Sequence, residues 1–503
     1  MNLIKKMKCD VVVIGSGISG LTVAALLASC GKEVVIVEGS SLPGGAIKRF
    51  KRKGIDFDIG FHYTGCLDSQ GILAKIWSLV GILPNLFIQS FPEGSAEEIR
   101  FFHSDKSAKL HFSYEETEHS LCQSFPAYSK QIKEYLQTIE EIANSVPFFN
   151  YNLPVESFIR GGWPYRRKPL KDFFCKLAIP KELVAVLCQP IFLYGVPLDQ
   201  TSLGIHAIVA HSYLSGAYHI NGGGQAIVNS FLERFNQLGV KVLTKEKVER
   251  IFHKNNKITG VDTQKQHIQA ENVVYTGHPT HLLDLIDHEP FRPIYVSRLK
   301  ELENTDSMFI VFGSLMPNTS VSDYFRWRNL YCISLNDAWV TDSSSNNSHE
   351  SIMVTCPGLR DGGDHPKGGM LIRPASWNEA SSFWAGPKQR KQGYKEWKEE
   401  QVDKLCKKIG QFWPNLHNSF KVVTASSPLT FADELSAPQG TVYGVKHSSA
   451  QIAPTVRTKV AGLFLSGQST MMTGVVGASL SAITTVGEMI GFDQIWPKLI
   501  EAS

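Results

Sequence analysis

Residues 10–38 read DVVVIGSGISGLTVAALLASCGKEVVIVE, and this stretch carries the strongest structural signal in the chain. The segment 11–14 is a short β-branched run, typical of a strand buried on both faces of a parallel sheet. An apolar, alanine-rich helix is expected over 21–29, with Gly31 as its C-terminal cap. A second strand is expected over 33–37. This order of strand, turn, helix and strand predicts an α/β fold with a Rossmann-like parallel sheet.

A glycine fingerprint, Gly15-Ser16-Gly17-Ile18-Ser19-Gly20, lies between the first strand and the helix. Gly15 permits the sharp turn, Gly17 lets a pyrophosphate approach the backbone, and Gly20 lets helix and strand pack closely. The phosphates would sit at the helix N-terminus, where free N–H groups and the positive end of the helix dipole attract them. Glu38, 18 residues after Gly20, is placed to hydrogen-bond a ribose hydroxyl. We therefore predict a dinucleotide site formed by Ser16, Ile18 and Ser19 together with the three glycines and Glu38.

A second glycine pair, Gly44-Gly45, follows this unit, and the segment 57–65 (FDIGFHYTG) comes next. Nicotinamide dehydrogenases need no second pair at this point. Flavoproteins that hold an extended FAD do need one, because the chain must pass close to the ribityl and flavin end. The stretch resembles retinol saturases and carotenoid isomerases, which are phytoene-desaturase-like flavoproteins. The resemblance implies FAD as the cofactor, with Gly44, Gly45 and His62 beside it.

Later segments carry the same resemblance, closest to the retinol saturase branch. They are the stretches 193–197 (LYGVP), 222–227 (GGGQAI), 240–250, 427–430 (SPLT), 437–440 (APQG), 462–468 (GLFLSGQ) and 474–478 (GVVGA). The resemblance implies that the backbone of Val248 holds the adenine and that Gly467 and Gln468 line the ribityl chain. It also implies a helix that begins near Gly474 and Val475 and directs its N-terminus at the flavin.

The resemblance further implies an interrupted layout of domains. A Rossmann-like FAD-binding domain of the glutathione-reductase type would consist of 1–66, 205–290 and 424–492. An interleaved α+β substrate domain would consist of 67–204 and 291–423, followed by a C-terminal tail, 493–503. Within the substrate domain we expect strands over 307–315 and 351–356 and an amphipathic helix over 394–412.

Composition excludes several classes of function. Lys and Arg number 51 against 47 Asp and Glu, which leaves a formal net charge of +4. This net charge is too small for a protein that binds nucleic-acid phosphates, so no nucleic-acid partner is predicted. The nine cysteines form no C-x-x-C pair and have no histidine at zinc-like spacing. They indicate buried thiols in a reducing compartment, without a metal site, and the predicted location is the cytoplasm.

Membrane contact is predicted at the surface only. Two uncharged apolar stretches, 11–31 and 460–487, are long enough to be confused with export or membrane-spanning segments. Asp10 stands at the entrance of the first, and glycines interrupt both. The region 146–198 combines aromatic with basic residues, which suits a peripheral patch on anionic lipid. The alternative for this region is a solvated loop above a packed helix.

The resemblance implies an FAD-dependent oxidoreductase that acts on the carbon–carbon double bonds of a polyene, a retinoid or carotenoid or another unsaturated lipid, by saturation or isomerisation. Such a substrate calls for an apolar tunnel. His62 is the candidate for proton transfer, since an imidazole titrates near neutral pH. The alternative is that His62 only packs against or hydrogen-bonds the cofactor. There is no second nucleotide fingerprint, so the sequence does not indicate the electron donor.

Two other functions share this pattern. A flavin amine oxidase has a similar fold, but such proteins usually carry an Arg directly after the glycine pair, where this chain has Ala46. A non-enzymatic protein of the GDP-dissociation-inhibitor type would bind a prenylated partner without FAD. In such a protein Glu38, Gly45, Gly467 and Gln468 would be free to change, yet all four are present.

Overall fold

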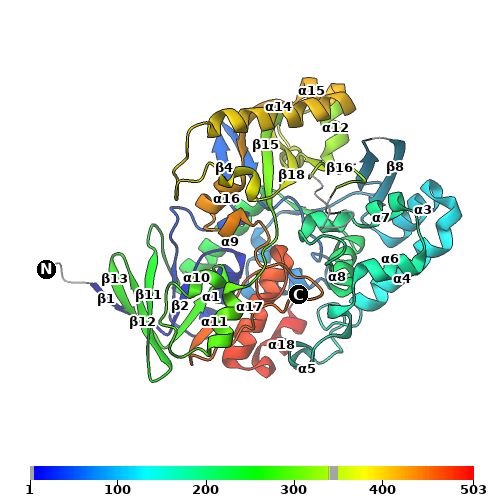
Figure 1. The fold of residues 1–503 in the computed structure, drawn as a ribbon. Coiled ribbons are helices and arrows are strands. Elements are labelled where there is room, and N and C mark those ends of the chain that lie inside the picture. Colours follow the sequence, from blue (N-terminus) through cyan, green and yellow to red (C-terminus); the bar gives the residue numbers. More distant parts are fainter. Residues whose placement is uncertain (1–4, 103, 338, 340–348, 503) are drawn as a thin grey trace.

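The structure, a computed structural model, describes residues 5–102, 104–337, 339 and 349–502. It is a mixed α/β protein, which confirms the predicted fold class, and its described strands form three larger sheets and two two-stranded sheets (Figure 1). The strands of the central sheet are β2 (Val11–Ile14), β3 (Val34–Val37), β10 (Lys241–Leu243), β14 (Asn272–Tyr275) and β20 (Leu463–Leu465). Those of the four-stranded sheet are β1 (Lys5–Lys8), β11 (Val248–Lys254), β12 (Lys257–Thr263) and β13 (Gln266–Gln269).

A seven-stranded sheet and the two pairs complete the set of strands. The large sheet contains β7 (Ala96–Phe101), β8 (Ser104–His111), β15 (Ser307–Leu315), β16 (Arg328–Ile333), β17 (Ile352–Thr355), β18 (Lys367–Ala375) and β19 (Lys421–Ser426). The pairs are β4 (Arg49–Arg52) with β5 (Ile55–Asp58), and β6 (Ile88–Ser90) with β9 (Tyr218–Ile220).

The α-helices of the described residues connect these sheets and pack against them. In the first half of the chain they are α1 (Ile18–Ser29), α2 (Ile72–Val80), α3 (Tyr114–Ser124), α4 (Ser129–Ala143), α5 (Val155–Gly161), α6 (Leu170–Leu177), α7 (Lys181–Leu187), α8 (Leu203–Leu214) and α9 (Gly223–Leu238). In the second half they are α10 (Pro279–Leu282), α11 (Pro293–Lys300), α12 (Ser320–Arg326), α13 (Asn378–Ser381), α14 (Tyr394–Phe412), α15 (Pro414–Ser419), α16 (Pro428–Glu434), α17 (Gly474–Ile490) and α18 (Phe492–Glu501).

The central sheet is parallel throughout, in the order β10-β3-β2-β14-β20. The predicted strand over 11–14 is confirmed as β2, and the predicted helix is α1, which begins three residues early because Gly17 is its N-cap. Gly31 follows this helix with a φ of +79°, a left-handed conformation that favours glycine. The carboxyl ends of parallel strands meet at one edge of a sheet, so the turns after β2 and β20 lie together.

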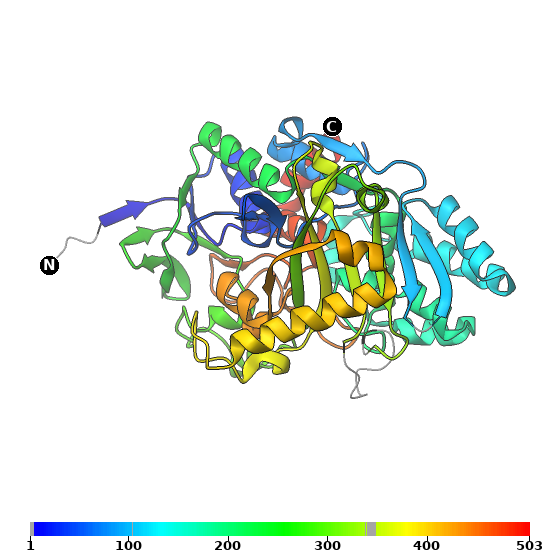
Figure 2. The same cartoon turned by 90° about the horizontal axis from the view of Figure 1, so that it is seen from above.

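The seven-stranded sheet is covered differently on its two faces. Phe309 and Val311 pack under α14 on one face, while Ile310 and Phe312 face the main core on the other, as strand alternation requires. Seen from above, α14 lies across the strands (Figure 2). The strands expected over 307–315 and 351–356 and the helix over 394–412 are confirmed as β15, β17 and α14.

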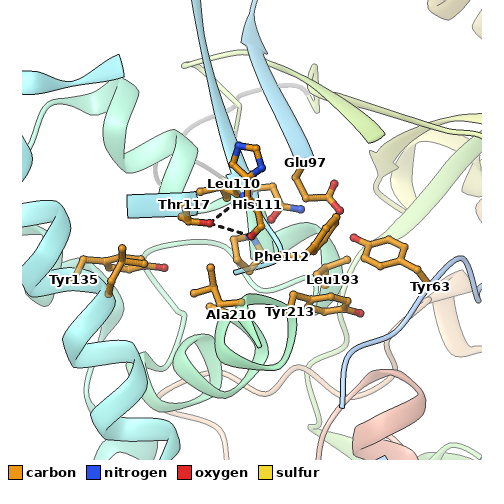
Figure 3. A pocket seen from close by; sticks show the side chains of 14 residues that line it. Tyr63, Glu97, Leu110, His111, Phe112, Thr117, Tyr135, Leu193, Ala210 and Tyr213 are labelled. Carbon is orange, nitrogen blue, oxygen red and sulfur yellow. Dashed lines mark hydrogen bonds between the residues drawn. The ribbon is translucent and has the colours of Figure 1, made fainter. Parts of the chain in front are cut away.

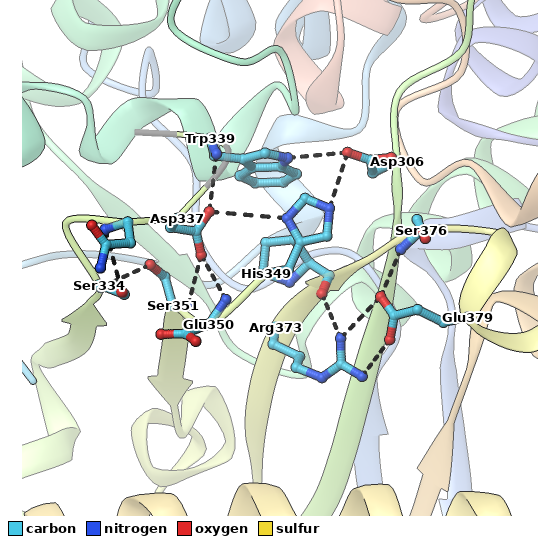
Figure 4. A network of polar contacts seen from close by, with 12 residues as sticks. Asp306, Ser334, Asp337, Trp339, His349, Glu350, Ser351, Arg373, Ser376 and Glu379 are labelled. Carbon is cyan, nitrogen blue, oxygen red and sulfur yellow. Dashed lines mark hydrogen bonds and ion pairs between the residues drawn. The ribbon is translucent and has the colours of Figure 1, made fainter. Parts of the chain in front are cut away.

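A cluster of charged side chains, Asp306, Asp337 and His349, lies near the end of β16 (Figure 4). His349 lies between Asp306 (3.4 Å) and Asp337 (3.9 Å), and the Trp339 indole donates to Asp306 (3.2 Å). Asp337 also accepts hydrogen bonds from the backbone N–H groups of Trp339 and Ser351. Burial opposes the charge on His349, but the hydrogen bonds and charges of its two carboxylate partners raise its pKa to about 9. His349 is therefore charged at neutral pH.

This charge makes one contribution to stability depend on pH. His349 binds a proton more tightly in the folded state, so its contribution is complete below its ordinary pKa of 6.5 and is lost as the pH rises through about 9. We expect H349Q to melt below the wild type at pH 6 and the two melting temperatures to converge above pH ~9. Thermal unfolding of the wild type and of H349Q between pH 6 and pH ~9 tests this expected convergence. A constant difference at every pH would contradict the assignment of the charge.

Among the described residues, no helix combines the length and the apolar character needed to cross a membrane. The apolar stretch 460–487 instead forms β20, a turn and most of α17. The same described part of the chain contains no cluster of His, Cys, Asp and Glu that could hold a metal ion, and its cysteines are free thiols.

Candidate functional site

The first glycine motif forms the turn between β2 and α1. Gly15 has a φ of +101°, and a side chain at Gly20 would collide with the carbonyl oxygen of Gly15. These two glycines are therefore required by the fold itself. A Cβ added at Gly17 meets no protein atom within 4 Å, so the space in front of the helix N-terminus is open. The opening fits a bound pyrophosphate, which would accept hydrogen bonds from the first N–H groups of α1.

Glu38, at the end of β3, is held over this turn. One carboxylate oxygen accepts hydrogen bonds from the backbone N–H (3.0 Å) and the hydroxyl (2.5 Å) of Ser16, and the other accepts from the N–H of Ser40 (2.7 Å). Ser16, which belongs to the glycine fingerprint, and Ser40 therefore hold the Glu38 carboxylate in position beside the predicted dinucleotide site. Val248 begins β11 close by, because Glu246, two residues earlier, donates its N–H to the Glu38 carbonyl (3.0 Å).

The second glycine pair packs directly on the first motif. Gly44 has a φ of +114° and donates its N–H to the Ser16 carbonyl (3.0 Å). A Cβ on Gly45, which has a φ of +55°, would lie 3.2 Å from the Cα of Gly17. Only glycines combine these backbone angles with so close an approach. The structure therefore brings Gly15–Gly20, Glu38 and Gly44-Gly45 into one cradle.

The C-terminal motif reaches the same place from the far end of the chain. The Ser19 and Ser466 hydroxyls lie 2.7 Å apart although 447 residues separate them. Gly467, with a φ of +118°, donates its N–H to the hydroxyl of Ser481 on α17 (2.8 Å). Gly474 begins α17, and a Cβ at this position meets no protein atom within 4 Å. A second helix N-terminus therefore faces open space close to the first.

Ser466 and Ser481 were not singled out from the sequence. Their hydroxyls join α1, β20 and α17, and Thr485 adds a hydrogen bond to Ser466 (2.9 Å). The only local signal is a Ser directly before the Gly467 turn. Gln468, the neighbour of Gly467, directs its amide to the carbonyl of Val442 (3.4 Å), and Val475 occupies the first turn of α17.

His62 follows the β4–β5 pair and is half-buried. Its Nδ1 atom is buried and has no hydrogen-bond partner, while its carbonyl accepts a hydrogen bond from Arg360 (3.4 Å). Burial lowers the pKa of His62 to about 4, so the ring is neutral at pH 7. An orphaned buried nitrogen is expected where a bound group completes the hydrogen bonding.

A buried ion network holds the His62 segment in place. Arg49 contacts Asp58 (2.7 Å) and Asp361 (2.7 Å), and His219 lies 2.8 Å from Asp361. Asp361 also accepts the N–H of Gly222 (3.0 Å). Burial opposes its ionisation, but the hydrogen bond from His219 and the charge of Arg49 lower the pKa of Asp361 to about 2. The network ties β4, β5 and the glycine-rich start of α9 together.

A narrow, largely apolar pocket lies beside the His62 segment, and Tyr63, the next residue, is part of its lining (Figure 3). It lies between β7, β8, α4 and α8, and the volume open to a water-sized molecule inside it is about 30 Å³. Glu97 and Tyr63 are at one end and Tyr135 is at the other (Figure 3). Its lining is largely apolar, as expected of a substrate site, but this volume holds about one or two water molecules and not a polyene.

Several aromatic side chains of the region 146–198 pack inside the protein. Phe148 and Phe174 are buried, and Phe158, Trp163 and Phe173 are partly buried against the core. Its basic residues behave differently: Arg167, Lys168 and Lys171 are exposed. The surface of this region is therefore basic rather than aromatic, and membrane contact through it stays a prediction.

Comparison with known proteins agrees with the geometry. The family model of an NAD(P)-binding Rossmann-like domain matches residues 13–78. This supports a dinucleotide cofactor and covers both glycine motifs. A putrescine oxidase has the same fold, with a TM-score of 0.67 and 12% identity over 97% of this chain and 99% of that one.

Two named enzymes are similar over nearly the whole chain. An all-trans-retinol 13,14-reductase from Danio rerio is 27% identical and covers 94% of this chain and 85% of its own length. A chloroplastic prolycopene isomerase from Daucus carota is 22% identical and covers 97% of this chain and 82% of its own. The chain is therefore a homologue of the retinol 13,14-reductases and prolycopene isomerases and fits the retinol saturase branch that its motifs predict.

Proposed function

We propose that this protein is an FAD-dependent oxidoreductase that acts on the carbon–carbon double bonds of a polyene, a retinoid or carotenoid or another unsaturated lipid. The observation that carries this proposal is the similarity to enzymes named for retinol reduction and prolycopene isomerisation over more than nine-tenths of the chain. When bound, FAD supplies a hydride donor and acceptor for saturation or isomerisation. The cradle around Gly17 and the open start of α17 supply the space that an extended dinucleotide needs.

The proposed work of the protein is to bind and orient. Gly15–Gly20 with Ser16, Ile18 and Ser19 would hold the pyrophosphate, and Glu38 the ribose. The other proposed contacts with FAD are Gly44, Gly45, His62, Val248, Gly467, Gln468, Gly474 and Val475. Because His62 is neutral and its Nδ1 atom is unpartnered, we favour a hydrogen bond to the cofactor over proton donation by an imidazolium.

We also propose the division into domains that the sequence predicts. The FAD-binding domain would comprise 1–66, 205–290 and 424–492, and all five strands of the parallel sheet come from these ranges. The substrate domain would comprise 67–204 and 291–423. Six of the seven strands of the large sheet lie within it, and β19 (Lys421–Ser426) crosses its boundary. The tail, 493–503, contributes most of α18, which packs against α17 and α2.

The proposal is tested by the flavin itself. The purified protein is reduced without oxygen, and a retinoid, a carotenoid or a polyunsaturated fatty acid is then added. Return of the visible flavin absorbance with one class identifies the substrate and a saturating direction. Isomerisation is followed by chromatography of the product, since it consumes no electrons. A protein that turns over no compound of these classes, in either assay, overturns the proposal.

The same preparation separates the two alternatives. Hydrogen peroxide released from simple amines would identify an amine oxidase, and a colourless protein that binds prenylated partners would identify a GDP-dissociation-inhibitor-like function. The electron donor is sought by mixing the oxidised protein with NADPH, NADH and a reduced ferredoxin-type carrier in turn, because the chain carries a single nucleotide fingerprint.

Peripheral membrane contact through 146–198 is a further part of the proposal. It is supported by the exposed Arg167, Lys168 and Lys171, and each basic residue near an anionic surface contributes about 1 kcal/mol. Since the aromatic residues are turned inward, the attraction is electrostatic, and binding to phosphatidylserine vesicles should disappear when the salt concentration is raised to about 1 M. Salt-resistant binding in a sedimentation assay would contradict this origin.

A further inference from the structure

Another pocket lies on the face of the seven-stranded sheet that α14 covers. It is lined by one face of α14, by α15, by β18 and by the start of β19 with the residue before it, and we call it the α14 pocket. The volume open to a water-sized molecule inside it is about 320 Å³, against about 30 Å³ in the pocket beside Tyr63. Pockets that bind small molecules typically enclose about 300–1,000 Å³, so the α14 pocket is large enough to hold one.

The floor of the α14 pocket is apolar and buried. It is formed by Leu371, Ile409, Leu416 and Phe420, and these residues are at most 8% exposed. Water in such a space contacts apolar side chains that offer it no hydrogen bonds, so its displacement by an apolar ligand is favourable.

Glycines bring the walls of the α14 pocket close together. Gly313 of β15 and Gly369 of β18 are partners across the two strands, and a Cβ added at Gly313 would collide with the Phe420 ring, while one at Gly369 would touch it. The ring therefore lies close to the surface of the sheet. A Cβ at Gly410 of α14 would lie 3.0 Å from the His417 ring, so α15 closes against α14. The hollow thus belongs to the packed fold and is not a gap between loosely held elements.

The sheet separates the α14 pocket from the cradle proposed for the dinucleotide. Leu371 points to α14, whereas its neighbours Met370 and Ile372 belong to the main core on the opposite face, as strand alternation requires. In Figure 1, α14 and α15 lie at the outside of the molecule, away from α1 and α17. A ligand of the α14 pocket is therefore an additional molecule, separate from the proposed flavin and from a substrate that reacts with it.

The charges at the α14 pocket favour an uncharged ligand. The described lining contains no Lys or Arg, so a carboxylate drawn into the pocket would lose water without gaining a cation. Asp403 is the one acid of that lining, and it is exposed, so a cation that pairs with it gains little. Cys406 is half-buried, and burial together with the charge of Asp403 raises the pKa of its thiol, which stays neutral at pH 7.

We propose that the α14 pocket binds a small, uncharged molecule that is mainly hydrocarbon, through contact with its apolar floor. A macromolecular partner fits less well, because the apolar surface lies inside the hollow. Of the described apolar lining residues Val422 alone is exposed, at 44%. The inference goes beyond the proposed function and does not depend on it.

Protection of Cys406 tests the proposal, because this residue lines the pocket and reports on no other site. The purified protein, with FAD added, is alkylated with N-ethylmaleimide at pH ~8, and mass spectrometry gives the rates at Cys406 and at the exposed Cys175, which is the internal control. The probe is naphthalene, up to its solubility limit. We expect it to slow alkylation of Cys406 at least about threefold by mass action and to leave Cys175 unchanged. An unchanged rate at Cys406, or equal slowing at both cysteines, overturns the proposal.

Two charged analogues test the class of ligand. They are 2-naphthoate and 2-(aminomethyl)naphthalene, which carry the same ring system with an anionic or a cationic group. We expect neither to protect Cys406 at a lower concentration than naphthalene does, because the described lining offers no cation and its one acid is exposed. The reverse order for either analogue overturns the proposed class.

A variant that fills the space assigns the binding to the α14 pocket. Val402 is half-buried in the lining, so the larger ring of V402F should occupy part of the volume and weaken protection by naphthalene at least about tenfold. K404F is the matched control, because Lys404 is exposed on the opposite side of α14, and it should be protected as the wild type is. Equal protection of the two variants overturns the proposal. The wild-type rates at Cys406 and Cys175 decide the matter even if V402F does not fold.

A second copy of the chain is the competing occupant of the α14 pocket. Without naphthalene, we expect the alkylation rate of Cys406 to be independent of protein concentration. A rate that falls as the protein concentration rises, together with a smaller apparent size of V402F than of K404F in gel filtration, would show that another copy covers the pocket, and this result overturns the proposal.

Discussion

The variant G17V is expected to be a folded protein without flavin. Gly17 has a φ of −63°, which valine adopts readily, and an added Cβ meets no protein atom within 4 Å. The side chain would instead fill the space proposed for the pyrophosphate. We expect flavin affinity to fall by at least about tenfold, or about 1.4 kcal/mol. Visible absorbance of the purified variant measures occupancy, and thermal unfolding against flavin-stripped wild type measures the fold.

Gly20 provides the contrast. A Cβ there would collide with the Gly15 carbonyl oxygen, so G20A is expected to unfold at lower temperature with or without flavin. If G17V bound flavin as well as the wild type does, the cradle would hold something other than a dinucleotide, and the function proposed above would lose its cofactor site.

The second large effect is expected from removing Arg49. Its guanidinium is the cation that both Asp58 and Asp361 contact at 2.7 Å, and Asp58 is buried. The change R49M leaves the buried Asp58 without its cation and leaves Asp361 with only His219 and the Gly222 N–H as partners. Breaking a buried pair in this way costs about 3–5 kcal/mol, and we expect the free energy of unfolding to fall by that amount. Chemical denaturation with and without flavin measures it.

The matched control is R250M. Arg250 pairs with Asp287 at 2.9 Å, but both side chains are more than half exposed, so the loss should stay within about 1 kcal/mol. Asp361 adds a pH dependence: its folded pKa of about 2 lies below its ordinary 3.8, so its contribution is present above pH ~4 and is lost as the pH falls toward 2. Equal losses for the two arginine variants would show that the Arg49 network is not buried in solution.

The dinucleotide unit was predictable because its signals act over short distances. Gly15, Gly20 and Gly31 are each needed by a turn or a close approach within the same 30 residues, and β-branched residues mark the strands beside them. Such local requirements are visible in one stretch of sequence. The β15 and β17 strands and the α14 helix were predictable for the same reason.

The polar networks were not predictable in this way. Glu97 and Glu98 are neighbours of the same type, yet one lines the pocket and the other pairs with Arg100 on the opposite face. Which of them faces the pocket depends on how β7 sits in the sheet, next to β16, whose residues follow more than 200 positions later. The aromatic residues of 146–198 show the same limit, since their composition does not reveal whether a core or a membrane covers them.

By itself, the sequence determined the β2–turn–α1–β3 unit and the glycines that leave room for a dinucleotide, because a strand, a tight turn and a helix are specified by neighbouring residues. The tertiary structure alone decided that Ser466 meets Ser19, that Asp361 meets Arg49 and that Glu97 faces the pocket. The first two contacts join residues 447 and 312 positions apart, and Glu97 is held by Asn329, 232 positions later. Closing such long loops costs little more entropy than closing shorter ones, so burial of the whole core, and not any local pattern, selects the pairs.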